Sequence, residues 1–243
     1  MAIWHTGTLL KKEMVAANVM SLTFSLADWV MHRPGQHYDI RLTAPSGYMA
    51  ERSYSAASTP EDTGVVEYGV QILENGEVSP YLFQLKEGQQ VEMRGPIGGH
   101  FVWDTTMPGP LVLIGGGSGM VPLMAMLRHH INHLEKDTGR KIIFIVSARS
   151  LDLVLYKDEL KKIQEKDSNV NVVITLTDNP PSDWTGYKRR VDKEMLIDVL
   201  GNIKDEMPMT YICGPTPFVE VVAGHMIGLG FTAHSIKTER FGG

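Results

Sequence analysis

Cysteine is almost absent from this chain. Its one cysteine, Cys213, cannot form an internal disulfide, and a single thiol cannot hold an iron-sulfur cluster or a cysteine-rich zinc site. Any redox chemistry therefore needs a bound organic cofactor. The segment 1–5 carries no basic stretch leading into an apolar one, and no apolar run reaches the roughly 18 residues of a membrane span. We expect a cytoplasmic protein without a membrane partner.

An excess of positive charge is also missing. Lysine and arginine number 23 against 28 aspartates and glutamates, which gives a net charge of -5 and argues against a nucleic-acid partner. With 43% hydrophobic and 21% charged residues, the composition is that of a globular protein and excludes disordered or fibrous classes. A length of 243 residues suits two small domains or one large one.

The residue pattern changes near the middle of the chain. Residues 1–106 consist of short β-type runs between turn residues, which is typical of a barrel or sandwich, with one short helix predicted to begin at Ser79 as N-cap and Pro80 in its first turn. Residues 107–243 alternate apolar strands with amphipathic helices, which predicts a parallel, doubly wound sheet. The expected strands are 3–14, 19–25, 37–42, 65–72, 90–94, 111–114, 141–147, 170–175, 209–213 and 236–241, and the later helices are 121–134, 157–165, 193–200 and 217–229.

A glycine-rich turn follows the strand at 111–114 and leads directly into a helix. Without Cβ atoms, the backbone of Gly115, Gly117 and Gly119 can approach a ligand closely, and N–H groups at the helix start can bind phosphate. Met120 or Pro122 occupies the place of the third glycine, so the spacing differs from G-x-G-x-x-G. A plain strand-to-helix turn is the alternative.

Two further motifs carry ligand-binding chemistry. On an extended segment Arg52 and Tyr54 share one side, offering a guanidinium to a phosphate and a ring to a planar ligand. Cys213 stands at the end of an apolar strand, where doubly wound sheets bind ligands. The alternatives are surface residues on a barrel strand and a small buried hydrophobe.

Histidines do not suggest a metal site. His129 and His133 have the i,i+4 spacing of ligand pairs, but the metalloprotease pattern would need a glutamate between them. We expect surface histidines and no bound metal.

Taken in order, these motifs resemble the ferredoxin-NADP reductase superfamily. The segments that carry the resemblance are 52–55, 76–79, 94–98, 115–122, 213–215 and 239–241. The resemblance implies an N-terminal antiparallel six-stranded Greek-key β-barrel that binds FAD, at residues 1–106, and a C-terminal doubly wound parallel α/β domain that binds NADPH or NADH, at residues 107–243.

The same resemblance implies roles for individual residues. Arg52 would pair with the flavin diphosphate, Tyr54 would pack on the isoalloxazine, and Ser55 would lie near its N5 atom. Glu239 and Phe241 would close the site. Ser55, Cys213 and Glu239 are the expected catalytic residues, acting by tuning and positioning. The remaining cofactor-binding residues are Ser53, Val70, Gln71, Ile72, Gly76, Val78 and Ser79 for the flavin, and Gly115, Gly117, Ser118, Gly119, Pro122, Arg149, Cys213, Gly214 and Pro215 for the nicotinamide nucleotide.

The choice between NADH and NADPH stays open on the sequence. Arg149 and the basic run 188–190 suit a 2'-phosphate, whereas Asp178, after Thr177, would repel one.

The resemblance implies an FAD-dependent NAD(P)H oxidoreductase that is similar to ferredoxin-NAD(P)H reductases. Hydride from NAD(P)H would pass to flavin, and single electrons would pass to a separate acceptor protein, a ferredoxin or an oxygenase component, because the chain has no cysteine cluster of its own. The alternatives are a non-catalytic flavin-binding electron-transfer subunit and a free flavin reductase.

Overall fold

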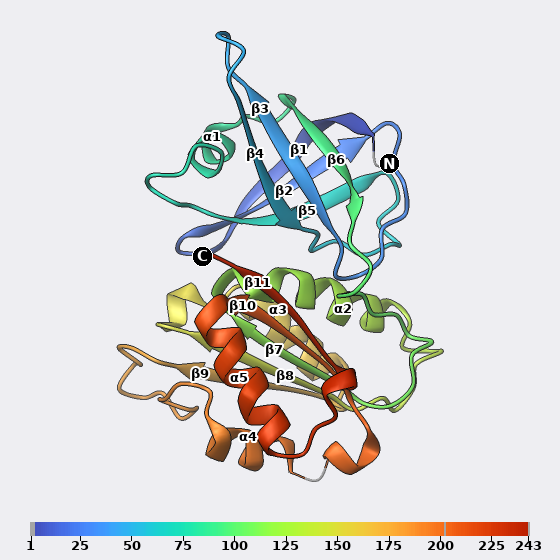
Figure 1. Ribbon diagram of the computed structural model, residues 1–243, viewed down its shortest axis with the longest axis vertical. Coiled ribbons are helices and arrows are strands. Elements are labelled where there is room, and N and C mark those ends of the chain that lie inside the picture. The colour runs from blue at the N-terminus through green and yellow to red at the C-terminus, as the bar shows by residue number, and fades with distance from the viewer. Residues whose placement is uncertain (1–2, 202, 243) are drawn as a thin grey trace.

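The chain folds into two halves, one stacked on the other (Figure 1). This computed structural model describes residues 3–201 and 203–242. The last strand of the first half ends at Ile97 and the first strand of the second begins at Leu111, so the expected boundary at 106/107 lies within this connection. None of the helices in the described part of the chain has the length and apolar character needed to cross a bilayer.

The first half is a six-stranded antiparallel sheet that closes on itself. Its strand order is β4-β3-β6-β1-β2-β5, and beyond the end of β4 a bridge between Ala56 and Tyr68 of β5 joins the two edges into a barrel. The predicted barrel is confirmed. The strands are β1 (Trp4–Ala16), β2 (Val19–Leu26), β3 (His37–Thr43), β4 (Met49–Ser55), β5 (Val65–Gln71) and β6 (Gln90–Ile97).

Alternating side chains fill the barrel. Phe24, Tyr38, Tyr68 and Met93 are among its fully buried residues, and the Tyr38 and Tyr68 rings meet edge to face with their centroids 5.8 Å apart. This period-two burial on each strand is the physical reason that the first half reads as β-structure in the sequence.

The short helix α1 (Ser79–Gln84) begins one residue earlier than the sequence suggests. Val78 occupies the N-cap position and Ser79 is the first helical residue, so the predicted N-cap was wrong. The Ser79 hydroxyl accepts a hydrogen bond from the Leu73 N–H at 3.1 Å instead. It therefore holds the loop that precedes the helix. Pro80 lies in the first turn, as predicted.

The second half is a five-stranded parallel sheet with helices on both faces. Its order is β11-β10-β7-β8-β9, which confirms the doubly wound fold, with the winding direction reversing between β7 and β10. Its elements are β7 (Leu111–Gly116), α2 (Met120–Asn132), β8 (Ile142–Ala148), α3 (Lys157–Lys166), β9 (Val170–Leu176), α4 (Lys193–Leu200), β10 (Met209–Pro215), α5 (Thr216–Gly228) and β11 (Ile236–Phe241).

Each face of this sheet has its own apolar core. Side chains such as Leu113 and Phe144 pack with α2 and α3, while their neighbours Ile114 and Ile145 pack with α4 and α5. Strands buried on both faces read as continuous apolar runs, which is the pattern seen in the sequence. Helix α2 runs along the contact between the halves (Figure 1).

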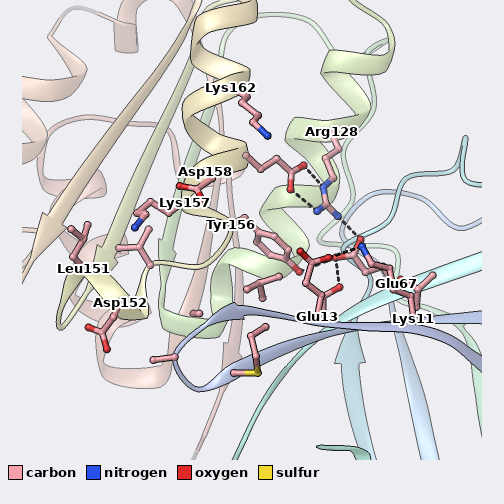
Figure 2. Close-up of a pocket in the computed structure, with 18 residues that line it drawn as sticks. Lys11, Glu13, Glu67, Arg128, Leu151, Asp152, Tyr156, Lys157, Asp158 and Lys162 are labelled. Atoms are coloured by element: carbon pink, nitrogen blue, oxygen red, sulfur yellow. Dashed lines mark hydrogen bonds and ion pairs between the residues drawn. The ribbon is translucent and has the colours of Figure 1, made fainter. Parts of the chain in front are cut away.

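Arg128 of α2 joins the two halves. Its guanidinium donates to Glu67 Oε2 of the barrel at 2.9 Å and makes two bonds of 2.7 Å to the carboxylate of Glu159 on α3 (Figure 2). Tyr156 donates to Glu67 Oε1 at 3.2 Å. These residues form part of the wall of a polar cavity of about 870 Å³ between β1, β2 and α3.

Candidate functional site

Two adjoining cavities lie on the contact between the halves. One, of about 510 Å³, is lined mainly by the barrel, and the other, of about 270 Å³, is lined mainly by the α/β half. They share four lining residues, which are Gln71, Ser118, Pro215 and Phe241. A ligand in one cavity would therefore lie against a ligand in the other.

The larger cavity lies between the two edge strands of the barrel. Residues 52–55 of β4 form one wall, while Gly69 and Gln71 of β5 and the loop 73–79 form the others. Edge strands present backbone N–H and C=O groups that lack a partner strand, so this wall can hydrogen-bond a planar heterocycle. Gly69 is required here for another reason, because a Cβ atom would lie 2.5 Å from Val121 Cγ2 of α2.

Arg52 provides the positive charge of this cavity. In the structure its Nη2 donates to Glu77 Oε2 at 3.3 Å, and Tyr48 donates to the other oxygen of Glu77 at 2.6 Å. The Arg52 side chain is 56% exposed, so a phosphate can reach it, but that phosphate has to compete with Glu77. The sequence motif 76–79 contains Glu77, yet its pairing with Arg52 was not expected.

The three residues that follow Arg52 on β4 all line the cavity. Tyr54 is half-buried in the cavity wall, and burial raises the pKa of its phenol to about 12. Ser55 also lines the cavity. Ser53 lines the cavity as well, and its hydroxyl donates to Asp39 Oδ1 at 2.6 Å. A ligand at Ser53 would therefore meet a hydroxyl that Asp39 already holds.

Three residues expected at the flavin site contribute differently. Val70 is fully buried in the barrel core and Ile72 is exposed, and neither lines the cavity. Gln71 is one of the residues that both cavities share.

The glycine-rich turn forms a wall of the smaller cavity. Gly117 has a φ of +56°, a conformation that favours glycine, and it lines the cavity together with Ser118. A Cβ atom on Gly119 would lie 2.2 Å from the carbonyl oxygen of Cys213, so only glycine lets the turn approach β10. Gly115, Gly119 and Pro122 are buried and shape the turn rather than line the cavity.

This turn lies at the point where the sheet reverses its winding. Gly115 of β7 pairs with Cys213 of β10, and Cys213 pairs with Glu239 of β11. Open α/β sheets bind ligands outside the carboxyl ends of strands at such a point. Gly214 packs beneath the site against Phe218, where a Cβ atom would come within 2.8 Å of the ring.

Cys213 and Glu239 differ in their ionisation. Burial, together with the charge of Glu239, raises the pKa of the Cys213 thiol well above its ordinary value, so this cysteine is a neutral thiol and not a nucleophile. Burial also raises the pKa of Glu239 to about 7, and its Oε2 is buried without a hydrogen-bond partner among the described residues. An unsatisfied buried oxygen at this place is available to a ligand.

His37 of the barrel faces Glu239 across the contact. Its Nδ1 lies 3.9 Å from Glu239 Oε1, and burial lowers the pKa of His37. Near neutral pH this imidazole is uncharged, so it does not supply Glu239 with a cation.

Phe241 stands where the two cavities meet. It lines both of them and is 37% exposed. An aromatic ring at this point occupies the space that two stacked heterocycles would need. Residues Asn18, Leu73 and Phe218 also line the cavities. Sequence reasoning missed them because they have no motif of their own and come from loops and faces that only folding brings together.

The donors of the site suit a dinucleotide pair. A guanidinium and a half-buried phenol lie on the barrel side, a glycine turn opening a helix lies on the other, and each cavity leads into its neighbour. These groups match the needs of a flavin with its diphosphate and of a nicotinamide nucleotide.

Comparison with known families finds two models that match the chain one after the other. The family model described as the oxidoreductase FAD-binding domain matches residues 6–103, and that of the oxidoreductase NAD-binding domain matches residues 113–224.

The chain is similar to two kinds of curated relatives. NADH-cytochrome b5 reductase 1 of Cryptococcus neoformans is 28% identical over 239 residues, which cover 95% of this chain and 80% of the relative. One subunit of the Na(+)-translocating NADH-quinone reductase of Serratia proteamaculans is 32% identical over 203 residues, which cover 79% of this chain and 49% of the relative. The chain thus spans about half the length of the latter.

Solved structures share the fold. The cytochrome P450 reductase GcoB of Amycolatopsis superimposes with a TM-score of 0.84 at 24% identity, covering 99% of this chain and 70% of that one. A ferredoxin NADP+ reductase from Neisseria gonorrhoeae, solved with FAD and NADP, superimposes with a TM-score of 0.81 at 17% identity, covering 98% of both chains. The two matched models together span most of the chain and show that it belongs to the oxidoreductases in which an FAD-binding domain precedes an NAD-binding domain, and the solved structures show that it has the fold of a ferredoxin NADP+ reductase.

Proposed function

We propose that this protein oxidises NADH and passes the electrons one at a time to a separate protein acceptor. The observation that supports the proposal best is the junction of the two cavities at Gln71, Ser118, Pro215 and Phe241. Bound FAD supplies a ring that accepts a hydride from a nicotinamide and can release electrons singly. The residues of the chain bind, orient and shield the two ligands.

On the barrel side, each residue has a distinct task. Arg52 would bind the diphosphate and exchange Glu77 for it, while Gly76 and Val78 of the loop before α1, and Ser79 at its first position, would offer backbone N–H groups. Tyr54 would pack on the ring system, and Ser55 would approach its reactive edge. The edge strands would bind the polar rim of the ring through their backbone.

On the α/β side, Gly117 and Ser118 would receive the nucleotide phosphates at the start of α2. Cys213 and Glu239 would lie beside the nicotinamide, the first as a neutral packing group and the second as a group whose charge depends on pH. Phe241 would cover the flavin face until the nicotinamide displaces it.

The smaller cavity has few basic residues for the 2'-phosphate of NADPH, which supports NADH. Four basic residues of the sequence suit a 2'-phosphate; Arg149 lines the cavity, whereas 188–190 do not. Arg189 is already bound by Glu194 at 2.8 Å and by Asp192. The two curated relatives described above are also named as NADH enzymes.

The relatives support the transfer of electrons from this protein to a separate acceptor. The names of the relatives refer to cytochrome b5 and to a quinone, and those of the solved structures to a cytochrome P450 and to ferredoxin. We propose a ferredoxin or an oxygenase component for this chain. A free flavin reductase, by contrast, would release its flavin during gel filtration.

Replacing Arg52 with alanine tests the flavin site. Because a charge-assisted contact of about 1.5–3 kcal/mol disappears, we expect the dissociation constant of FAD to rise by roughly 10- to 150-fold. Fluorescence titration of the flavin-free protein measures this constant. The change Glu77→Gln removes the carboxylate that competes for Arg52, and should leave the affinity for FAD unchanged or increased.

Arg41→Ala is the matched control for this experiment. Arg41 makes a two-bonded pair with Glu92 at 3.0 and 2.7 Å on the same barrel but lies outside the cavity. It should retain FAD as the wild type does. If Arg52→Ala binds FAD as tightly as the wild type, Arg52 does not bind the diphosphate. A wild-type protein that binds no flavin at all would refute the proposed function.

The raised pKa of Glu239 leads to a pH-dependent rate. Ionised Glu239 stabilises the positive charge that develops on a nicotinamide as it loses hydride, so the rate of flavin reduction by NADH should rise about tenfold as pH increases through about 7. In Glu239→Gln this step should disappear and the rate should stay at the low-pH level. Stopped-flow absorbance at saturating NADH measures both profiles, and a step that persists in the variant would assign the titration to another group.

A further inference from the structure

A cluster of three possible metal ligands lies at the opposite end of α2 from the glycine turn. His129 lies in the last turn of the helix and His133 is its C-cap residue, with their ring centroids 4.5 Å apart. Glu61 comes from the barrel loop between β4 and β5. The expectation of surface histidines was wrong for His129, which is only 7% exposed and packs edge to face on Trp103.

The distances within the cluster suit a small tetrahedral ion. His129 Nδ1 is hydrogen-bonded to Glu61 Oε1 at 2.9 Å, so that zinc would replace the proton of this bond. Glu61 Oε1 lies 3.8 Å from His133 Nε2, and the three ligand atoms all lie within 4.8 Å of one another. Zinc bound at 2.0–2.1 Å separates tetrahedral ligand atoms by about 3.3 Å. Small side-chain rotations therefore bring this set to zinc geometry.

Hydrogen bonds already orient the possible ligands. His133 Nδ1 lies 3.0 Å from the backbone oxygen of His129, and a carbonyl only accepts, so Nδ1 carries the proton and Nε2 presents its lone pair toward Glu61. Metal-binding histidines commonly have such a carbonyl partner on their other nitrogen. Asn132 Nδ2 donates to Glu61 Oε2 at 3.3 Å and steadies the carboxylate.

The chemistry of the set selects the class of ion. Two imidazoles and one carboxylate are ligands typical of zinc, whereas calcium and magnesium prefer oxygen ligands throughout. The C-terminal end of a helix also favours a cation. The partly exposed Glu61 and His133 leave room for a water molecule as the fourth ligand.

We propose that Glu61, His129 and His133 form a zinc site that connects the barrel to α2. Because α2 begins at the glycine turn, zinc at its far end would fix the helix against the barrel without touching the flavin or nucleotide cavities. The site is independent of the proposed electron transfer.

Zinc binding and thermal stability of the flavin-loaded protein test this proposal. At about pH 7.5, where free imidazole is neutral, equilibrium dialysis should give one zinc ion per chain, and zinc should raise the melting temperature. Glu61→Gln and His133→Gln should each raise the zinc dissociation constant at least tenfold and abolish the shift in melting temperature. These two variants are preferred to changes at the buried His129, which can unfold the protein.

His234→Ala is the matched control, because His234 is exposed in a short turn of the α/β half. It should bind zinc as the wild type does. Zinc X-ray absorption should show nitrogen and oxygen ligands that include imidazole. Failure of the wild type to bind stoichiometric zinc, or equal affinity in Glu61→Gln and His133→Gln, would overturn the site, and neither result depends on flavin reduction.

Discussion

Replacing Arg128 with alanine is expected to lower the free energy of unfolding by about 3–5 kcal/mol. The Arg128 side chain is only 18% exposed, and its guanidinium binds two carboxylates, Glu67 of the barrel and Glu159 of α3. It also donates to the Ala57 carbonyl at 2.8 Å. Truncation leaves both carboxylates partly buried without their shared cation. Urea unfolding of the flavin-loaded protein, followed by circular dichroism, measures the loss.

Arg189→Ala provides the comparison for this prediction. Arg189 also binds two carboxylates, Asp192 and Glu194, but its side chain is 44% exposed. Exposed pairs contribute about 0–1 kcal/mol, so this variant should unfold close to the wild type. Adding Glu67→Gln to Arg128→Ala should restore part of the lost stability. An Arg128→Ala protein as stable as Arg189→Ala would show that the contact between the halves does not depend on this ion pair.

Replacing Gly119 with alanine is expected to reduce kcat/KM for NADH about 100-fold, because a displacement of about 1 Å at a site that positions reactants has this effect. The new Cβ atom would lie 2.2 Å from the carbonyl oxygen of Cys213, which belongs to the backbone and cannot rotate away. Either the glycine turn or the end of β10 must move. The flavin cavity is formed mainly by the barrel, so FAD binding should stay unchanged. Steady-state kinetics and FAD titration separate the two effects.

Gly224→Ala controls for the substitution itself. Gly224 lies in α5, and apart from its chain neighbours and the backbone of its own helix no atom lies within 4 Å of the position of its added Cβ. This variant should keep wild-type kinetics and gain slight stability from the higher helix propensity of alanine. If Gly119→Ala shows the same kinetics as Gly224→Ala, the turn does not position the nucleotide.

Local pattern was sufficient to predict most of the fold. The strands of the second half read as apolar runs because both faces of the sheet are covered, and the strands of the first half alternate because one face fills a barrel. Strand β4 was expected only as an extended segment. Its buried positions are few, so periodicity marks it weakly.

The role of a single side chain depended on the hydrogen-bond partner that the fold brings to it. Ser79 has the residue type of an N-cap, but its hydroxyl accepts a hydrogen bond from the N–H of Leu73, six residues earlier. Ser53 stands in the flavin motif, yet Asp39 of the neighbouring strand binds its side chain. At Ser79 a contact made by the folded chain replaced the local preference, whereas at Ser53 the contact occupies the hydroxyl of a residue that still lines the cavity.

The sequence by itself determined the two domain types, the order of nearly all their elements and the turns that open toward ligands, because hydrophobic periodicity and glycine conformation act over a few residues. Tertiary structure alone decided that Arg128 meets Glu67, that Glu61 meets His133, and that Phe241 stands between two cavities. Each of these contacts joins segments far apart in the chain. Their positions follow from how the barrel docks on α2 and β11, and no local preference encodes that docking.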